Sequence, residues 1–187
     1  MSNLGIGRYG YTQPYNRNTV GKNTALRNAS NQCSTSNITL NYTDQATGSK
    51  ATNCIGFPNG SSASVFKSEQ YSAGTPSYLV RYWDGSGNEQ KADIKPKEVD
   101  PSNASYLEML AYSAYADENG YAPNAFHNFN YATLDSDGNM NYDADSIHSK
   151  NNFKALIADY MDMQYQANNH ASYLSYKRFF DFMNGSY

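Results

Sequence analysis

Side chains that carry oxygen ligands gather between Asp135 and Asp143, the stretch of this sequence with the clearest potential for chemistry. They are Asp135, Asp137, Asn139, Asn141 and Asp143, with Gly138 among them. Calcium takes six or more oxygen ligands, and acidic loops of this kind can supply them. In an EF-hand alignment, however, the first ligand position falls on Thr133 and the last on Ala144, and no helix is predicted upstream. We therefore expect a hairpin turn at Asp137-Gly138, with a calcium-dependent binding module as an alternative.

The three histidines, His127, His148 and His170, are the next candidates for chemistry. They lack the i, i+4 spacing of a helical metal site, so we expect surface or capping roles. A hydrolase acting on glycans or peptides would need His127 or His148 beside a carboxylate such as Asp135 or Asp143. The sequence contains no nucleophile elbow and no phosphate-binding fingerprint. We expect no catalytic residue and no cofactor, and keep the hydrolase as an alternative to a non-enzymatic protein.

An aromatic pair, Tyr82-Trp83, offers a third kind of site. Aromatic rings present large amphipathic surfaces, so this pair could form a platform for a sugar or a peptide. Packing on a sheet face explains the same two residues equally well. The ligand platform and the packing role both stay open at this point.

The composition restricts the class of protein. The 187 residues carry a net charge of −3, are 39% hydrophobic and only 17% charged, and include 18 tyrosines. Binding to nucleic acid needs a concentrated basic face, which this charge balance does not favour. No apolar run approaches the roughly 20 residues of a membrane-spanning helix. We therefore expect a protein or glycan partner, no nucleic acid and no membrane span.

The two cysteines, Cys33 and Cys54, lie 21 positions apart. They do not form the paired C-x-x-C spacing of a zinc site. The spacing permits a disulfide in an exported protein and equally two free thiols.

The segment from residue 77 to 120 shows the strongest structural pattern. Tyr78, Val80 and Tyr82 alternate with Ser77, Leu79 and Arg81, as in a strand with two unlike faces. Asp84 to Gly87 fits a tight turn, and the return strand runs from Asn88 to Ile94. Asp100-Pro101 is the predicted helix start, with Asp100 as N-cap and Pro101 in the first turn. The capping-box spacing of Ser105 and Glu108 offers an alternative start a few residues later. The helix buries Leu107, Leu110, Ala111, Ala114 and Tyr115, and ends at Gly120.

Shorter patterns predict the rest of the fold. Residues 36–42 and 64–66 are predicted as strands, and 55–60 as a turn-rich link. Helical spacing returns at residues 150–167 and again from 173 to 183. The sequence therefore predicts an α+β fold, with a small, mostly antiparallel sheet and three helices. This domain would occupy residues 36–187.

Residues 1–35 form a flexible polar leader in this interpretation. Their basic residues are Arg8, Arg17, Lys22 and Arg27, and no acidic residue occurs before Asp44. An acid-poor, serine-rich start resembles export leaders in composition, although no secretory signal pattern is present. We expect export without a classical signal peptide, and otherwise a cytoplasmic protein.

Two segments, Tyr78–Gly120 and Ile157–Met183, carry a family resemblance. Their residues, YLVRYWDGSGNE with VDPSNASYLEMLAYSAYADENG, and IADYMDMQYQANNHASYLSYKRFFDFM, resemble an uncharacterised protein family of flagellated, gut-type clostridia. The resemblance covers about half of the chain and includes a short leader rich in Gly, Tyr, Ser and Asn. The resemblance implies a bacterial, exported protein of unknown function and brings no catalytic residue with it. The polar composition, the leader and the lack of a catalytic motif in the sequence lead us to expect a non-enzymatic, exported or surface-associated interaction protein.

Overall fold

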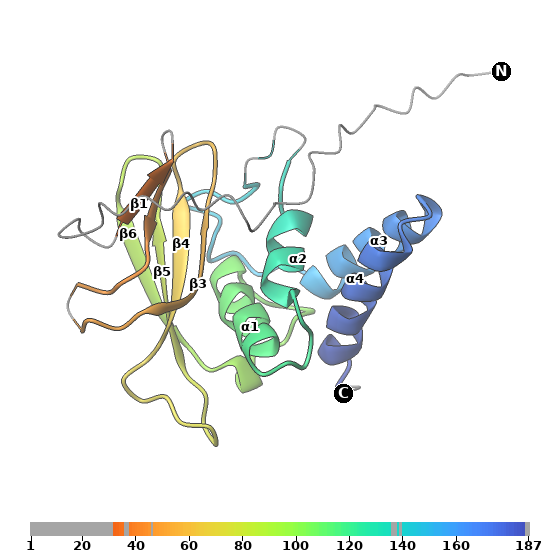
Figure 1. Cartoon of the computed structure of the whole chain (residues 1–187), viewed down its shortest axis with the longest axis horizontal. Helices are drawn as coiled ribbons and strands as arrows, with labels where there is room; N and C mark the ends of the chain where they lie inside the picture. Colours follow the sequence, from red (N-terminus) through yellow and green to blue (C-terminus); the bar gives the residue numbers. More distant parts are fainter. Residues whose placement is uncertain (1–31, 36–37, 46, 136–137, 139, 186–187) are drawn as a thin grey trace, which may run out of the picture. The chain divides into compact units, whose positions relative to one another are not determined.

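The computed structural model describes residues 32–35, 38–45, 47–135, 138 and 140–185. The chain divides into two units, residues 1–30 and 31–187, and all of the described residues belong to the second. This unit is α+β, as predicted, and combines antiparallel strands with four α-helices in its described part (Figure 1). The strands are β1 (Gln32–Thr35), β2 (Ile38–Asn41), β3 (Ala51–Gly56), β4 (Ser62–Lys67), β5 (Tyr78–Trp83) and β6 (Glu89–Ile94). The helices are the short 3₁₀ turn η1 (Pro96–Glu98), α1 (Tyr106–Glu118), α2 (Ala125–Ala132), α3 (Phe153–Gln166) and α4 (His170–Met183).

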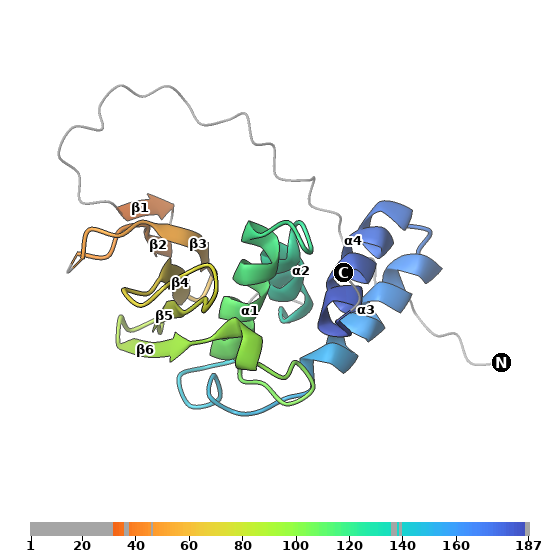
Figure 2. The same ribbon diagram turned by 90° about the horizontal axis from the view of Figure 1, so that it is seen from below.

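The main sheet has four antiparallel strands in the order β3-β4-β5-β6, and β1 pairs separately with β2. Alternation along each strand gives the sheet two different faces. The inner face carries buried apolar residues, among them Val65, Tyr78, Val80 and Tyr82. The outer face, with Leu79, Arg81 and Trp83 on β5, points away from the helices. Figure 2 shows the order of the layers as sheet, then α1 and α2, then α3 and α4.

Helix α1 lies in the centre of the domain and is buried on nearly all sides. From Tyr106 to Ala116 each residue except Glu108 is buried. The predicted apolar face, with Leu107 and Leu110, is confirmed, but the opposite face is covered as well. Tyr112 contacts the rings of Phe179 and Phe182 on α4. A helix that is apolar all round is the expected sequence for such a position.

The capping box decides where α1 begins. Ser105 Oγ accepts a hydrogen bond from Glu108 N at 3.2 Å, and Glu108 Oε2 accepts one from Ser105 N at 2.6 Å. This pair satisfies two backbone donors that the first helical turn leaves without partners. The predicted start at Asp100-Pro101 is therefore wrong, and the alternative start at Ser105 is the observed one. Asp100 instead accepts a hydrogen bond from Ser102 N in a turn.

Replacing Ser105 with alanine is expected to lower the free energy of unfolding by about 1 kcal/mol, because one helix-start donor loses its acceptor. Urea unfolding monitored by circular dichroism would measure this loss. Ser102, an exposed serine in the preceding turn, provides the matched control, since Ser102→Ala should change stability by less than about 0.5 kcal/mol. Equal losses in the two variants would contradict the capping role.

The carboxylate of Glu108 should make part of the stability depend on pH. Burial tends to raise its pKa, but hydrogen bonds from Lys150, at 2.6 Å, and from Ser105 outweigh burial and lower the pKa. Because the pKa of Glu108 is lower in the folded state, its ionised carboxylate stabilises the protein at pH values above the ordinary glutamate pKa. This contribution is lost as the pH falls through the folded-state pKa. The stability difference between the wild type and Glu108→Gln should be largest near neutral pH and shrink in acid. A difference that grows on acidification in urea unfolding would contradict this assignment.

The number of helices differs from the prediction, because α2 was not expected. Its segment is rich in Asn, His and Tyr, and no apolar period marks it. Tertiary contacts account for its burial: Asn130 Oδ1 accepts from the Tyr106 hydroxyl at 2.6 Å, and Asn128 Nδ2 donates to Ser175 Oγ at 2.8 Å. Helices α3 and α4 confirm the two predicted C-terminal helices. Asn168, with a φ of 56°, adopts the left-handed conformation between them.

Two strand boundaries also differ from the prediction. Strand β1 lies within residues 1–35 and pairs with β2, so residues 32–35 belong to the second unit. The remainder of the predicted leader lies outside the described residues. Strand β3 was not predicted, and its last two residues are the start of the predicted turn-rich link at 55–60. All six residues of β3 are half-buried, so burial does not alternate along the strand. Its sequence, ATNCIG, accordingly lacks the apolar–polar alternation that would predict a strand.

Candidate functional site

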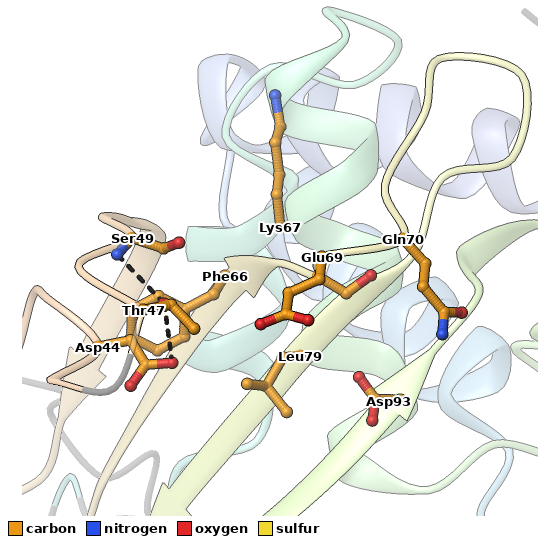
Figure 3. A pocket seen from close by; sticks show the side chains of 10 residues that line it. Asp44, Thr47, Ser49, Phe66, Lys67, Glu69, Gln70, Leu79 and Asp93 are labelled. Atoms are coloured by element: carbon orange, nitrogen blue, oxygen red, sulfur yellow. Dashed lines mark hydrogen bonds between the residues drawn. The ribbon is translucent and has the colours of Figure 1, made fainter.

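A hollow of about 410 Å³ lies on the outer face of the main sheet. Its lining residues come from the β2–β3 turn, from β4 and the loop after it, and from β5 and β6. They are Asp44, Thr47, Ser49, Phe66, Lys67, Ser68, Glu69, Gln70, Leu79 and Asp93 (Figure 3). The hollow combines apolar side chains from the strands with carboxylates from three separate segments.

The strand register builds the floor of the hollow. Leu79 on β5 lies opposite Phe66 on β4 and opposite Asp93 on β6. Phe66 is only 1% exposed, whereas Leu79 is half-buried. In Figure 3, Leu79 lies between the side chains of Asp44, Glu69 and Asp93. A ligand in this hollow would therefore meet an apolar centre with acidic groups around it.

One wall of the hollow is the tight turn between β2 and β3. Asp44 accepts hydrogen bonds from Thr47 Oγ1 at 3.1 Å and from Arg81 Nη1 at 2.8 Å. The backbone of the turn closes with Gly48 N donating to Asp44 O at 2.8 Å. The charge of Asp44 is therefore balanced by Arg81, and the bond between them holds the turn against the sheet.

Arg81 is the centre of a charged cluster on the outer face. Its side chain also forms an ion pair with Glu89, and its guanidinium lies 5.2 Å from the centre of the Trp83 ring. Burial tends to raise the pKa of Glu89, but the hydrogen bond and charge of Arg81 lower it. Lys91 approaches the same carboxylate, at 3.4 Å. Arg81 and Lys91 thus both have acidic partners.

Lys67 is the basic residue in the lining, but its ammonium group points away from the carboxylates of the hollow (Figure 3). It forms an ion pair with Glu118 at the end of α1 and lies 4.6 Å from the centre of the Tyr71 ring. Glu118 also accepts a hydrogen bond from the Tyr78 hydroxyl at 2.8 Å. Burial, followed by the bond to Glu118, raises the pKa of Tyr78 well above its ordinary value. This cluster joins the sheet to α1 and leaves the acidic side of the hollow unneutralised.

Glu69 and Asp93 differ from the other charged residues of the hollow. Neither makes an ion pair or a side-chain hydrogen bond within the part of the chain that the structure describes. Beside them, the enclosed Oγ of Ser68 also lacks a hydrogen-bond partner among the described residues. Among these same residues, no three His, Cys, Asp or Glu side chains are grouped closely enough to hold a metal ion. Within the described residues, the hollow thus contains two carboxylates that have no ion-pair or hydrogen-bond partner and do not form a metal site.

The predicted calcium ligands lie elsewhere, in the segment between α2 and α3. Asp137 and Asn139 lie outside the described residues. Asp135 O accepts from Gly138 N at 3.1 Å, and Leu134 bridges to Met140, so the segment makes a hairpin-like turn. Asp143 accepts from Ser146 Oγ at 2.7 Å, in a local turn. The expectation of no upstream helix is wrong, because α2 ends at Ala132.

Calorimetric titration with Ca²⁺ is expected to show no micromolar binding at Asp135–Asp143. The aspartate at the first loop position and the bidentate glutamate at the last are both absent, and these supply the strongest ligands of such a loop. A micromolar dissociation constant that Asp137→Ala abolishes would overturn this prediction. A signal that survives in Asp137→Ala would come from another part of the chain.

The three histidines lie apart from one another and none lines the hollow. The His127 ring is 4.4 Å from that of Tyr131, and burial lowers its pKa against the opposing charge of Asp117. His148 Nε2 lies 2.6 Å from Gln90 Oε1, and the His170 ring lies 6.3 Å from that of Tyr165. In the described residues, no hydrogen bond joins a histidine to Asp135 or Asp143, the pairs that the hydrolase hypothesis required.

Tyr82 and Trp83 lie on opposite faces of the sheet. Tyr82 is 2% exposed and belongs to the core, while Trp83 lies under the guanidinium of Arg81 on the outer face. The two rings therefore do not form a single platform. Packing accounts for both residues.

The residues of the hollow were not predicted as site residues. Leu79 and Arg81 were recognised only as one side of an alternating strand. Glu69 lies in the loop between β4 and β5, and no spacing connects it with Asp93. The alternation of Leu79, Arg81 and Trp83 on one strand face is the signal that could have drawn attention to this surface.

Cys54 carries a free thiol on β3. Burial raises its pKa to about 11, against the opposing effect of a hydrogen bond with Ser64. The side chain of Cys33 lies outside the described residues. The thiol of Cys54 is therefore protonated at neutral pH and shows no sign of nucleophilic activation.

Comparisons of the chain with family models, curated proteins and solved structures find no match. The resemblance to the clostridial family therefore stays a prediction. Within the described residues, no helix has both the length and the apolar character required to cross a bilayer. The fold and the hollow are consequently the basis for assigning a function.

Proposed function

We propose that this chain is a non-enzymatic interaction protein that recognises a partner protein through the hollow on the outer face of its sheet. The observation that carries this proposal is the hollow itself, where the half-buried Leu79 lies beside Glu69 and Asp93, two carboxylates without partners in the described residues. A concave apolar centre with a few convergent polar groups is the usual form of a binding site. Export of the protein to the cell surface stays a prediction from its composition.

A protein partner fits this hollow better than a glycan. Sugars are commonly held against open aromatic faces, which combine apolar area with a polar edge. Among the lining residues the aromatic side chain is Phe66, and it is almost completely covered. The neighbouring Trp83 is covered by Arg81. The exposed surface of the hollow is therefore aliphatic and acidic, which suits the side chains of a protein.

Nuclear magnetic resonance titration of the full-length, nitrogen-15-labelled chain would test the proposal. The probes are acetyl-Gly-X-Gly-amide peptides covering the twenty amino acids, with chitotriose and cellotriose as the glycan arm. At least one peptide should shift the amide signals of Ser68, Leu79 and Asp93 in a saturable way. Leu79→Trp, which fills the hollow, should abolish these shifts. Leu174→Trp, on an exposed face of α4, should retain them.

Three results would overturn the proposal. In the first, no peptide produces saturable shifts around the hollow. In the second, only a glycan binds there. In the third, Leu79→Trp binds the peptide as well as Leu174→Trp does, which would place the binding surface elsewhere.

A further inference from the structure

We infer that the group bound in the hollow is a basic side chain of the partner protein, a lysine or an arginine. Its aliphatic stem would lie on Leu79 and its cation would lie between Glu69 and Asp93. This inference rests on the proposed function and adds the chemical class of the ligand. It depends on three features of the outer face, which are its unpaired charges, its apolar floor and the spacing of its carboxylates.

The charges of the outer face are unevenly matched. Lys67 forms an ion pair with Glu118, while Arg81 forms ion pairs with Asp44 and Glu89. Lys91 also lies beside Glu89.

Lys67, Arg81 and Lys91 thus have acidic partners, whereas the carboxylates of Glu69 and Asp93 have none among the described residues. Acidic groups left unmatched in this way attract a positive ligand and disfavour an anionic one.

The floor of the hollow suits a side chain with a long aliphatic stem. Leu79 lies directly opposite Asp93 on the neighbouring strand, and Glu69 follows β4 by two residues. Figure 3 shows Leu79 next to both of these carboxylates, below Glu69 and beside Asp93. Lysine and arginine bury their methylene stems on apolar surface while the charged end stays among polar groups. Both parts of such a side chain therefore find a matching surface in this hollow.

The spacing of the carboxylates favours an organic cation over a metal ion. A hard metal ion requires several oxygen ligands at 2.0 to about 2.6 Å. The carboxylates of the hollow come from separate segments and do not form a group that could hold a metal within the described residues. An ammonium or guanidinium group carries several separate N–H donors, so it can pair with two carboxylates without the full set of oxygen ligands that a metal ion requires.

The experiment compares four acetyl-Gly-X-Gly-amide peptides, in which X is lysine, arginine, norleucine or glutamate, by titration of the full-length labelled chain. We expect the lysine or arginine peptide to bind with a dissociation constant on the order of 1 mM at low salt. Norleucine keeps the stem and lacks the charge, so it should bind roughly fivefold to tenfold more weakly. The glutamate peptide should cause no shift at Leu79 or Asp93. Raising the salt concentration to about 1 M should reduce the difference between lysine and norleucine.

Charge-neutralising variants identify the carboxylates. The double variant Glu69→Gln, Asp93→Asn should lose roughly fivefold or more in affinity for the lysine peptide. Glu98→Gln removes a single charge from η1, outside the hollow, and should bind as the wild type does. All of these side chains are exposed, so overlaid spectra of the unbound proteins will confirm that the fold is retained.

The outcomes separate this inference from the proposed function. If norleucine binds as tightly as lysine and arginine, or if glutamate binds better, the hollow is a peptide site but the inference is wrong. If the double variant binds the lysine peptide as tightly as Glu98→Gln does, the assignment to Glu69 and Asp93 is wrong. If none of the twenty peptides binds at the hollow, both proposals fail.

Discussion

Replacing Leu110 with alanine is expected to lower the free energy of unfolding by about 2–5 kcal/mol. Leu110 is fully buried in the middle of α1, which lies between the sheet and the other helices. The loss combines the transfer free energy of the removed methyl groups with the cost of the cavity they leave. Because layers on both sides hold α1, its surroundings have little freedom to close the cavity. We therefore expect a value in the upper half of this range.

Urea unfolding monitored by circular dichroism would measure this change. Leu174→Ala is the matched control, because Leu174 is 52% exposed on α4 and its truncation should cost less than about 0.5 kcal/mol. A Leu110→Ala variant that differs from the wild type by less than about 0.5 kcal/mol would show that α1 is not central to the core.

Replacing Arg81 with methionine should have the second-largest effect, a loss of about 3 kcal/mol. Methionine keeps most of the aliphatic stem and removes the charge. Asp44, whose side chain is only 7% exposed, and Glu89 then lose their shared cation. A carboxylate held away from water without its main cation is costly, so most of the loss comes from the acids that remain.

A double-mutant cycle with Asp44→Asn measures this coupling directly. If the ion pair carries the effect, the two substitutions should be non-additive by more than about 0.5 kcal/mol. Lys95→Met is the control, because it removes an exposed ion pair with Glu98 and should cost less than about 1 kcal/mol. Additive losses for Arg81 and Asp44 would contradict a coupled pair on the outer face.

Where the sequence predicted structure correctly, short-range interactions decide the conformation. The turn between β5 and β6 is one example. Asp84 Oδ1 accepts from Ser86 N and Asn88 N, both at 2.8 Å, and Gly87 has a φ of 84°. Each of these requirements is met by residues within five positions of one another. The residue types therefore carried enough information to place the turn.

Helix α2 shows why other elements could not be predicted. Asn130 lies in the interior because Tyr106 donates a hydrogen bond to it, and its own Nδ2 donates to Phe126 O at 2.7 Å. Without knowledge of Tyr106, which is 24 positions away, a segment rich in Asn has the composition of a loop. Burial of polar residues depends on such partners, and a single sequence does not display them.

The candidate site shares this dependence on distant partners. Asp44 and Arg81 lie 37 positions apart and meet only because the β2–β3 turn folds over the outer face. Leu79 and Asp93 become neighbours through strand register. The sequence could predict β5 with its two faces and the return strand β6, but it could not show which loop carboxylates would surround Leu79.

The order of the strands has a consequence for how the chain assembles. In the main sheet each strand pairs with the next one along the chain, so every pairing closes only a short loop. Short loops cost little entropy to close, and folds dominated by local pairings form quickly. The contacts that complete the burial of α1 join far more distant segments, such as Tyr112 with Phe182. We therefore expect the sheet to form first, with the docking of α3 and α4 as the late, slower step.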